Sequence, residues 1–323
     1  MREVTVGLLG CGTVGQGFVR LIQRERDRIR ARDGIDLRVG KILVRDVDKE
    51  RHGIDRAKLT TNAIDVIDDC DLLVELIGGV HSAGAYVRRA LRQGCHVVTA
   101  NKALLADSGR ELFAIAAAAG VRIGFEASVC GGIPIIRAIE RGLAGDSIDS
   151  ITGILNGTCN YVLTRMEESG ADFASALRMA QQRGFAEEDA RLDVTGEDAL
   201  QKLRILAELA FGGGHLRSRA HGIDDIASQE IEQARSRRCV VRLVAAARRV
   251  PGGVDLRVER RELPESHPLA SVRDENNAVI IRAKAVGEMM FVGKGAGSLP
   301  TAAAVLSDVI EIASGVQATV HAI

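Results

Sequence analysis

The sequence has no excess of charge of either sign. Its 323 residues include 43 Lys and Arg side chains and 43 Asp and Glu side chains, so the formal net charge is zero. A protein that neutralises the phosphates of DNA or RNA normally carries a basic excess. The balance therefore argues against nucleic acid as a partner and favours a small molecule.

Paired cysteines and long apolar runs are also missing. The six cysteines lie far apart without a C-x-x-C pair, so we expect no disulfide framework or zinc knuckle, only reduced thiols in the cytoplasm. The chain enters a strand pattern at its start, so we expect no cleavable leader. The most apolar stretch, Leu112–Gly120, lies between Arg110 and Arg122 and is too short to cross a bilayer. We predict a core helix there and no membrane partner.

The composition is that of an ordinary globular protein, 46% hydrophobic and 27% charged, and the length predicts about two domains. In the first third, short apolar runs alternate with amphipathic stretches, which is typical of βαβ units and predicts a doubly wound α/β domain. The expected strands are Val4–Leu9, Val39–Val44, Leu72–Ile77, His96–Thr99 and Val121–Phe125, and the expected helices are Gly15–Arg30, Ala83–Gln93 and Arg110–Ala119.

This alternation ends near Pro134, which suits the first position of a new helix. We therefore place a domain boundary after residue 133 and expect an α+β second domain from 134 to 297. Its expected helices are Cys159–Glu168, Phe173–Arg183 and Thr195–Phe211, its expected strands are Ile148–Leu155, Val240–Ala245, Val254–Val258 and Ala278–Val286, a turn is expected at Asn156 and Gly157, and a last helix at Pro300–Ile312.

A glycine-rich turn of the form GxGxxG follows the first predicted strand and precedes a helix pattern. Such glycines let the turn close tightly and let the main chain approach a pyrophosphate, while the helix N-terminus offers N–H donors to the anion. The motif alone is a weak signal, but the strand–turn–helix context supports it. A turn of structural use only is the alternative. The residues expected to contact a dinucleotide here are Gly10, Cys11, Gly12, Thr13, Val14 and Gly15.

Two residues compete for the end of the second strand, which normally reads the adenosine ribose. An acidic residue there binds a free 2′-hydroxyl, whereas a nearby Arg accommodates a 2′-phosphate. The sequence offers both Arg45 and Asp46. We favour Arg45 and therefore NADP, and we keep NAD open because Arg45 could equally extend into solvent.

The segment Ala180–Lys202 contains an acidic residue and a lysine at helical spacing. Thr195 and Asp198 resemble a capping box, and Asp198 and Lys202 are then i and i+4 neighbours at the edge of an apolar helix face. The pair could project into a cleft. It could also be an ordinary surface ion pair, and spacing alone does not decide.

The same segment resembles the signature of homoserine dehydrogenases. A glycine-aromatic-small turn is followed by acidic residues and by Asp-hydrophobic-x-Gly-x-Asp-x-x-x-Lys. One departure is Ala190, where the family usually has proline, and a second is His81-Ser-Ala, where it tends to have an acidic residue and proline. The matching positions are Gly184, Phe185, Ala186, Asp189, Asp193, Val194, Gly196, Asp198 and Lys202, and further family-like blocks are Leu8–Gly15, Glu75–Gly79, Thr99–Leu104, Phe125–Val129, Gly153–Thr158 and Gly293–Asp308.

The resemblance implies reversible hydride transfer between L-homoserine and L-aspartate 4-semialdehyde, in threonine, methionine and isoleucine biosynthesis. It implies that Lys202 handles the proton of the reacting oxygen and that Lys102 stands near the nicotinamide. A solvated Lys102 and a simple acidic turn at Glu187 are the alternatives. The implied substrate-binding residues are Glu187, Asp193 and Asp198, and the further residues implied to contact the cofactor are Gly78, Lys102, Gly184 and Gly297.

A cation site is also implied by the resemblance. It consists of the Glu126 side chain and the carbonyl groups of Val129, Gly131 and Ile133. Oxygen ligands alone suit a hard cation such as sodium better than zinc. A buried turn with a paired Glu126 is the alternative.

Larger-scale expectations follow from the resemblance too. We expect a homodimer joined through the second domain, and we expect segment 298–323 to return to the first domain. The chain ends shortly after its last helix, so we expect no appended regulatory domain and no feedback inhibition by threonine through one. A related dehydrogenase with another substrate and a non-catalytic nucleotide sensor are the competing functions. Asp198 and Lys202, which belong to the more specific signature, argue against the first. The combination of Glu187, Asp198, Lys102 and Lys202 argues against the second.

Overall fold

The chain divides into two compact units in the computed structural model, which describes residues 1–212 and 214–315. Unit 1 consists of residues 1–132 and the segment from Ala296 onward, and unit 2 consists of Ile133–Gly295. The boundaries predicted from the sequence lie after residues 133 and 297. The last residues of segment 298–323, from 316 onward, lie outside the described residues.

Unit 1 is built on a parallel sheet with the strand order β3-β2-β1-β4-β5-β6. Because the order reverses between β1 and β4, the carboxyl ends of these strands form the crevice in which doubly wound sheets bind ligands. The strands are β1 (Arg2–Leu9), β2 (Ile35–Leu43), β3 (Leu59–Thr60), β4 (Leu72–Glu75), β5 (His96–Thr99) and β6 (Ile123–Gly124), and the helices are α1 (Thr13–Asp33), α2 (Ala63–Ile67), α3 (His81–Arg92), α4 (Lys102–Ala119) and α11 (Ser298–Ala313).

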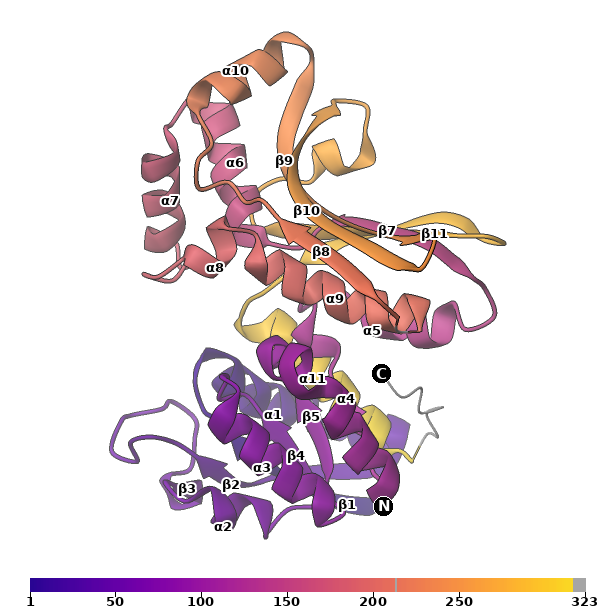
Figure 1. Cartoon of the computed structure of the whole chain (residues 1–323). Helices are drawn as coiled ribbons and strands as arrows, with labels where there is room; N and C mark the ends of the chain where they lie inside the picture. The colour runs from indigo at the N-terminus through magenta and orange to yellow at the C-terminus, as the bar shows by residue number, and fades with distance from the viewer. Residues whose placement is uncertain (213, 316–323) are drawn as a thin grey trace. The chain divides into compact units, whose positions relative to one another are not determined.

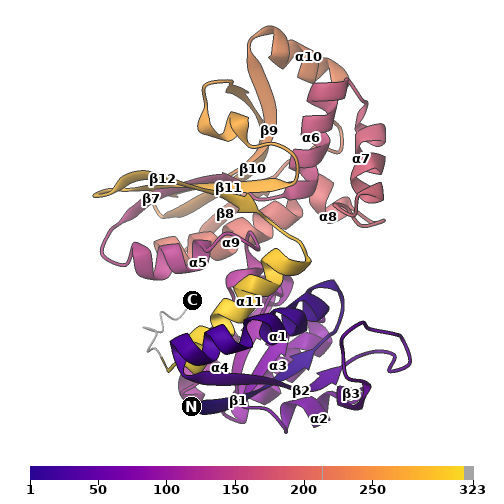
Figure 2. The same ribbon diagram turned by 180° about the vertical axis from the view of Figure 1, so that it is seen from behind.

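Helices cover both faces of this sheet. Helices α1 and α11 pack on one face through buried side chains such as Phe18 and Val309 (Figure 2). Helices α2, α3 and α4 pack on the other face through side chains such as Val87 and Leu112 (Figure 1). Continuous apolar strands between two helical layers are what the sequence predicted, so the doubly wound α/β domain is confirmed.

Unit 2 contains a mixed sheet with the strand order β12-β11-β7-β9-β10-β8, in which, among the described strands, only the β8–β10 pair is parallel. Helix α9 packs on this sheet through Leu200, Leu203 and Leu206, the apolar face expected from the sequence. The strands are β7 (Ile148–Ile154), β8 (Leu216–Ala220), β9 (Cys239–Val250), β10 (Gly253–Pro264), β11 (Asn276–Ala283) and β12 (Gly287–Lys294), and the helices are α5 (Ile135–Arg137, continued by a π-helical turn at Ala138–Gly142), α6 (Gly157–Ser169), α7 (Phe173–Gln182), α8 (Arg191–Val194), α9 (Glu197–Phe211) and α10 (Ser228–Ser236).

Two local predictions in unit 2 were wrong. Helix α9 does not begin at a capping box on Thr195, because Gly196 has a positive φ of 84° and interrupts the helix there. The Thr195 hydroxyl instead donates to the Arg191 carbonyl, one turn back. Asn156 does not form a turn with Gly157. Its side chain accepts the N–H of Cys159 and caps the start of α6.

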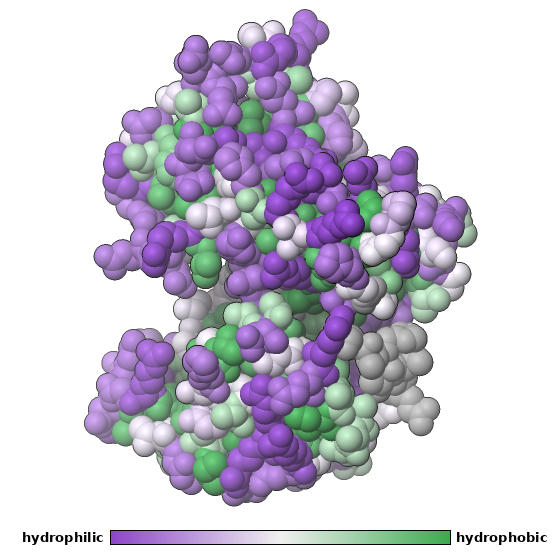
Figure 3. Space-filling view, viewed as in Figure 1, coloured by the Kyte–Doolittle hydropathy of each residue, from purple (hydrophilic) through white to green (hydrophobic). Residues whose placement is uncertain are grey.

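None of the described helices combines the length and apolar composition that a membrane span requires. The face of the molecule drawn in Figure 3 shows hydrophobic residues scattered among hydrophilic ones. Apolar residues on an exposed face are normal when they are dispersed in this way.

Candidate active site

The glycine-rich turn between β1 and α1 exposes its main chain. Gly10 has a φ of +101°, and a Cβ on Gly15 would lie 2.4 Å from the Gly10 carbonyl oxygen, so side chains are excluded at both positions. A Cβ on Gly12 would meet open space. Helix α1 follows without a side-chain cap or an acidic residue in its first turn. Its first N–H groups therefore suit an anion such as a pyrophosphate.

A buried carboxylate shapes the next loop at the same end of the sheet. Glu75, which is fully buried, accepts the N–H groups of Ile77 (2.9 Å) and Gly78 (3.1 Å) through one oxygen. Its other oxygen accepts the hydroxyl of Thr99 at 2.6 Å. Glu75 thus ties the end of β4 to the end of β5 and holds Gly78, whose φ is +72°, in a tight turn.

Lys102 is the first residue of α4 and does not lie on a loop. The buried Asn101 caps this helix by accepting the Leu104 N–H (3.1 Å), and its amide donates to the carbonyl of Gly79 (2.7 Å). Asn101 therefore fixes the Gly78–Gly79 turn against the start of α4. Both lie at the carboxyl ends of the strands, where ligands bind in such sheets.

The side chains of Arg45 and Asp46 have different surroundings after β2. The Asp46 carboxylate accepts the N–H groups of Asp48 (2.8 Å) and Lys49 (3.3 Å), so it is used to form the turn. Arg51 lies over this turn and donates to the carbonyl oxygens of Asp46 and Lys49. The exposed Arg45 side chain makes no hydrogen bond or ion pair with the described residues.

In unit 2, Lys202 and Asp198 form a largely buried ion pair. The Lys202 ammonium lies 2.7 Å from Asp198 Oδ2, and the two side chains are 13% and 9% exposed. The ammonium also donates to the Leu155 carbonyl at 2.8 Å. Because the two side chains are largely buried and held by neighbouring groups, the pair is not an ordinary surface ion pair, which was the alternative that the sequence left open.

A second carboxylate joins this pair through Asn156. The Asn156 amide donates to Asp193 Oδ1 at 2.6 Å and to Asp198 Oδ2 at 2.8 Å. The Cys159 thiol donates to the Asp193 carbonyl oxygen at 3.1 Å. Burial raises the pKa of this thiol well above its ordinary value, so it is a neutral group. The structure therefore brings Asp193, Asp198 and Lys202 together and adds Asn156, which has no predicted role.

The turn that contains Gly184 and Glu187 is fastened to the same helix, α6. The hydroxyl of Thr158 donates to the Phe185 carbonyl at 2.6 Å, and the Phe185 ring lies 5.0 Å from the ring of Tyr161. Gly184 has a φ of +74°. Glu187 is exposed, and its carboxylate has no hydrogen-bond or ion-pair partner in the described part of the chain. The structure thus does not join Glu187 to the cluster of Asp193, Asp198 and Lys202.

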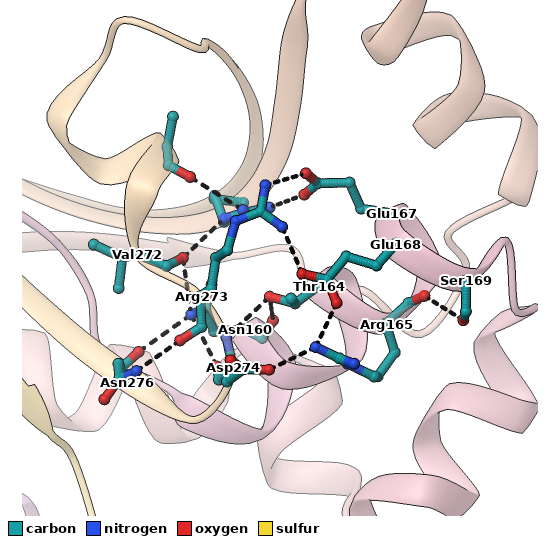
Figure 4. A network of polar contacts seen from close by, with 12 residues as sticks. Asn160, Thr164, Arg165, Glu167, Glu168, Ser169, Val272, Arg273, Asp274 and Asn276 are labelled. Carbon is teal, nitrogen blue, oxygen red and sulfur yellow. Dashed lines mark hydrogen bonds and ion pairs between the residues drawn. The ribbon is translucent and has the colours of Figure 1, made fainter.

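The other end of α6 is held by a polar network with the segment 270–276 (Figure 4). The Arg242 guanidinium is fully buried, where burial lowers its pKa and the nearby Glu167 carboxylate (2.9 Å) opposes that effect. Arg273 contacts Glu167 and Glu168, and Arg165 contacts Asp274. Since breaking a buried pair leaves a charge uncompensated, this network fixes the position of α6 firmly.

The expected cation ligands lie on a sharply turned segment. Glu126 is buried, and its main-chain N–H donates to Asp308 at 2.9 Å. The following residues Cys130 and Gly131 have positive φ angles of 53° and 34°. The Ile133 carbonyl accepts the N–H of Ile135. The described residues contain no group of three or more His, Cys, Asp or Glu side chains that could hold a metal ion. An oxygen-only site that relies on carbonyl groups would not require such a group.

Comparison with protein families agrees with this arrangement. A family model for the NAD-binding domain of homoserine dehydrogenase matches residues 10–126, and one for homoserine dehydrogenase matches residues 134–310. The homoserine dehydrogenase of Bacillus subtilis is 43% identical over 97% of this chain and 73% of its own length. That of Neisseria gonorrhoeae is 40% identical over 99% of this chain and 75% of its own length.

Solved structures lead to the same family. A homoserine dehydrogenase from Thiobacillus denitrificans superposes with a TM-score of 0.94 at 41% identity, covering 99% of this chain and 75% of that one. A hyperthermophilic archaeal homoserine dehydrogenase, solved in complex with NADPH, has a TM-score of 0.83 at 27% identity, covering 98% of this chain and 99% of that one. The chain therefore belongs to the homoserine dehydrogenase family of NAD(P)-dependent oxidoreductases.

Proposed function

We propose that the chain interconverts L-homoserine and L-aspartate 4-semialdehyde. In oxidation, the terminal carbinol carbon loses a hydride to the oxidised cofactor and the hydroxyl loses a proton, which leaves the aldehyde and the reduced cofactor. When bound, the nicotinamide ring accepts or returns the hydride. The observation that carries the proposal is the partly buried cluster of Asp193, Asp198 and Lys202 in unit 2, in a chain of this family.

Lys202 would manage the proton of the reacting oxygen. In the reductive direction, negative charge develops on the aldehyde oxygen, and an ammonium held in a largely buried site stabilises that charge and then protonates it. Asp198 and the Leu155 carbonyl orient the ammonium. In the oxidative direction, Lys202 would take the same proton back.

The carboxylates would hold the amino group of the substrate. Asp193, Asp198 and Lys202 together carry one more negative than positive charge, which favours the ammonium group of an amino acid. Glu187 would add a further carboxylate from its exposed turn. We retain Glu187, Asp193 and Asp198 as the substrate-binding residues.

The cofactor would bind to unit 1 with a preference for NADP. Arg45 carries an exposed guanidinium without a partner among the described residues, whereas Asp46 is used in its turn. A planar guanidinium suits a 2′-phosphate. Lys102 would stand near the nicotinamide. The further residues proposed to contact the cofactor are Gly10, Cys11, Gly12, Thr13, Val14, Gly15, Gly78, Gly184 and Gly297.

Two further features are proposed on family resemblance. The first is a sodium ion on the Glu126 carboxylate and the carbonyls of Val129, Gly131 and Ile133; the burial of Glu126 supports it. The second is a homodimer joined through unit 2. The terminal strand β12 supports it, because Val292 on this strand is 56% exposed.

A spectrophotometric assay tests the activity. The purified protein should reduce NADP or NAD in the presence of L-homoserine, followed at 340 nm. Lys202→Ala should lower kcat by about three orders of magnitude, the scale expected for an essential proton donor, while circular dichroism shows an intact fold. A wild type that is inactive with both cofactors would contradict the proposed function, and normal turnover by the variant would remove Lys202 from the mechanism.

A further inference from the structure

The buried Asn156 side chain occupies a central place in the cluster of Asp193, Asp198 and Lys202 in unit 2. It is 4% exposed and stands between β7 and the first residue of α6. Its oxygen accepts the N–H of Cys159 at 2.7 Å. A primary amide has two N–H donors, and here one goes to Asp193 (2.6 Å) and one to Asp198 (2.8 Å). The orientation of the amide is therefore fixed, because a flipped amide would place its oxygen against both carboxylates.

Asn156 acts on Lys202 through Asp198. The same atom, Asp198 Oδ2, accepts both the Asn156 amide and the Lys202 ammonium. The ammonium also donates to the carbonyl of Leu155, the residue directly before Asn156. The junction of β7 and α6 thus holds the ammonium by its main chain and the carboxylate by its side chain.

The amide cannot readily swing away from the carboxylates, since the start of α6 is anchored on its other side. A Cβ on Gly157 would lie 2.6 Å from the Glu275 carbonyl oxygen, so the two main chains are in close contact. One turn further, the Asn160 amide lies within 3.2 Å of three carbonyl oxygens of the segment 272–276 (Figure 4). A rigid helix start is what a positioning group requires.

We propose that Asn156 is a positioning residue of the reaction. Its amide bridges the Asp193 and Asp198 carboxylates and thereby holds Asp198, and through it the Lys202 ammonium, in the orientation that the reacting oxygen requires. Without the amide, the two carboxylates would lose the donor that bridges them and would repel each other, which favours the binding of a proton between them. The proposal rests on the proposed function, because it assigns Asn156 to the site formed by Asp193, Asp198 and Lys202.

Two substitutions separate charge from position. Asn156→Asp keeps the size and the capping oxygen but replaces both donors with a third carboxylate. Asn156→Ser keeps a good helix cap and adds no charge, but it cannot reach both carboxylates. We expect both variants to lower kcat for homoserine by about 100-fold, the usual consequence of a small displacement in an active site. The KM for NADP should stay within about twofold, because the cofactor contacts proposed for NADP lie mainly in unit 1.

The pH profile provides a readout that a purely structural role would not change. Like-charged carboxylates raise each other's pKa, so the acidic limb of kcat/KM should move to higher pH in both variants, and it should move further in Asn156→Asp, which adds a third carboxylate. Asn62→Asp is the matched control. Asn62 also caps a helix, by accepting the Ile64 N–H at 3.1 Å, and also donates to a carboxylate, Asp65, at 2.7 Å. It lies outside the site, so kcat should not change.

The outcomes are distinguishable. Turnover within twofold of wild type in both Asn156 variants, with an unchanged pH profile, would overturn the positioning role while the proposed function stands. So would a loss of kcat that matches the loss of folded protein in a melting curve. If Asn156→Asp does not fold, the positioning role is tested by the kcat of Asn156→Ser compared with that of Asn62→Asp. Equal values would overturn the role, and a lower value for Asn156→Ser would support it. A wild type without homoserine-dependent activity would instead refute the proposed function.

Discussion

Two adjacent side chains that follow β2 differ in whether their polar groups are already hydrogen-bonded within the protein. Asp46 has the chemistry to bind a ribose hydroxyl, but its carboxylate accepts two main-chain N–H groups of its own turn. The Arg45 guanidinium makes no hydrogen bond or ion pair with the described residues. The residue types alone were compatible with either NAD or NADP as the cofactor. The hydrogen bonds of Asp46 favour Arg45 as the residue that contacts the cofactor, and Arg45 can pair with a 2′-phosphate.

Arg45→Ala should therefore weaken NADP and spare NAD. A hydrogen-bonded ion pair with phosphate contributes about 1.5 to 3 kcal/mol, so the KM for NADP should rise by roughly 10- to 150-fold. Arg38→Ala is a suitable control, because Arg38 lies on β2, the strand that precedes Arg45, but contacts Glu3 and Asp36. Steady-state assays with both cofactors measure the ratio. An unchanged KM for NADP in Arg45→Ala would show that another group reads the phosphate.

At the scale of helices and strands, α1 and α11 can approach each other closely because residue 17 of α1 is a glycine. Gly17 lies on α1 facing the start of α11, and a Cβ there would lie 2.9 Å from the Ser298 carbonyl oxygen and 2.7 Å from its hydroxyl. The Ser298 hydroxyl donates to the Thr13 carbonyl at 2.8 Å. The segment that returns to unit 1 is thus seated directly on the helix that follows the glycine-rich turn.

Gly17→Ala should destabilise the protein, and the same change at Gly109 should not. At an interior position of a helix, alanine is favoured over glycine by about 1 kcal/mol. At Gly109 in α4 an added Cβ meets nothing within 4 Å, so Gly109→Ala should raise the free energy of unfolding by up to about that amount. At Gly17 the main chain of Ser298 must move, which costs about 1 to 3 kcal/mol. Chemical denaturation measures both; equal effects would contradict close packing at Gly17.

Elements with a strong apolar pattern could be predicted from the sequence, and those at sheet edges could not. The buried strands β1, β4 and β5 read as continuous apolar runs. Strand β8 contains Arg217, Ser218 and Arg219, because an edge strand need not be apolar, and it was missed. Strand β12 was missed in the same way, since its glycines resembled a loop.

In the candidate site, contacts between residues close in the sequence could be predicted, and contacts between distant residues could not. The Asp198–Lys202 pair depends on one helical turn, so spacing suggested it. The contacts of Asn156 join residues 37 and 42 positions apart, and no local pattern reveals them. An Asn before a helix signals a cap, and only the fold shows that the same amide also bridges two carboxylates.

For the whole molecule, the sheet of unit 2 leaves an apolar edge strand that a second copy would cover. Strand β12 is terminal in the sheet order, and its Met289, Met290 and Phe291 are only partly buried while Val292 is 56% exposed. A terminal strand of this kind carries unpaired main-chain groups and promotes association unless something covers it. In a symmetric dimer, the same strand would be covered in both copies.

Light scattering should accordingly give about twice the 34.5 kDa mass of one chain, and Val292→Lys should shift the equilibrium toward that single mass. A charge placed in a buried contact must be desolvated without a partner, so the dissociation constant should rise by at least about tenfold. Val286→Lys is the matched control: Val286 is equally exposed, at 56%, but lies in the turn between β11 and β12. A wild type of single mass would exclude the dimer, and equal effects of both substitutions would move the interface away from the strand.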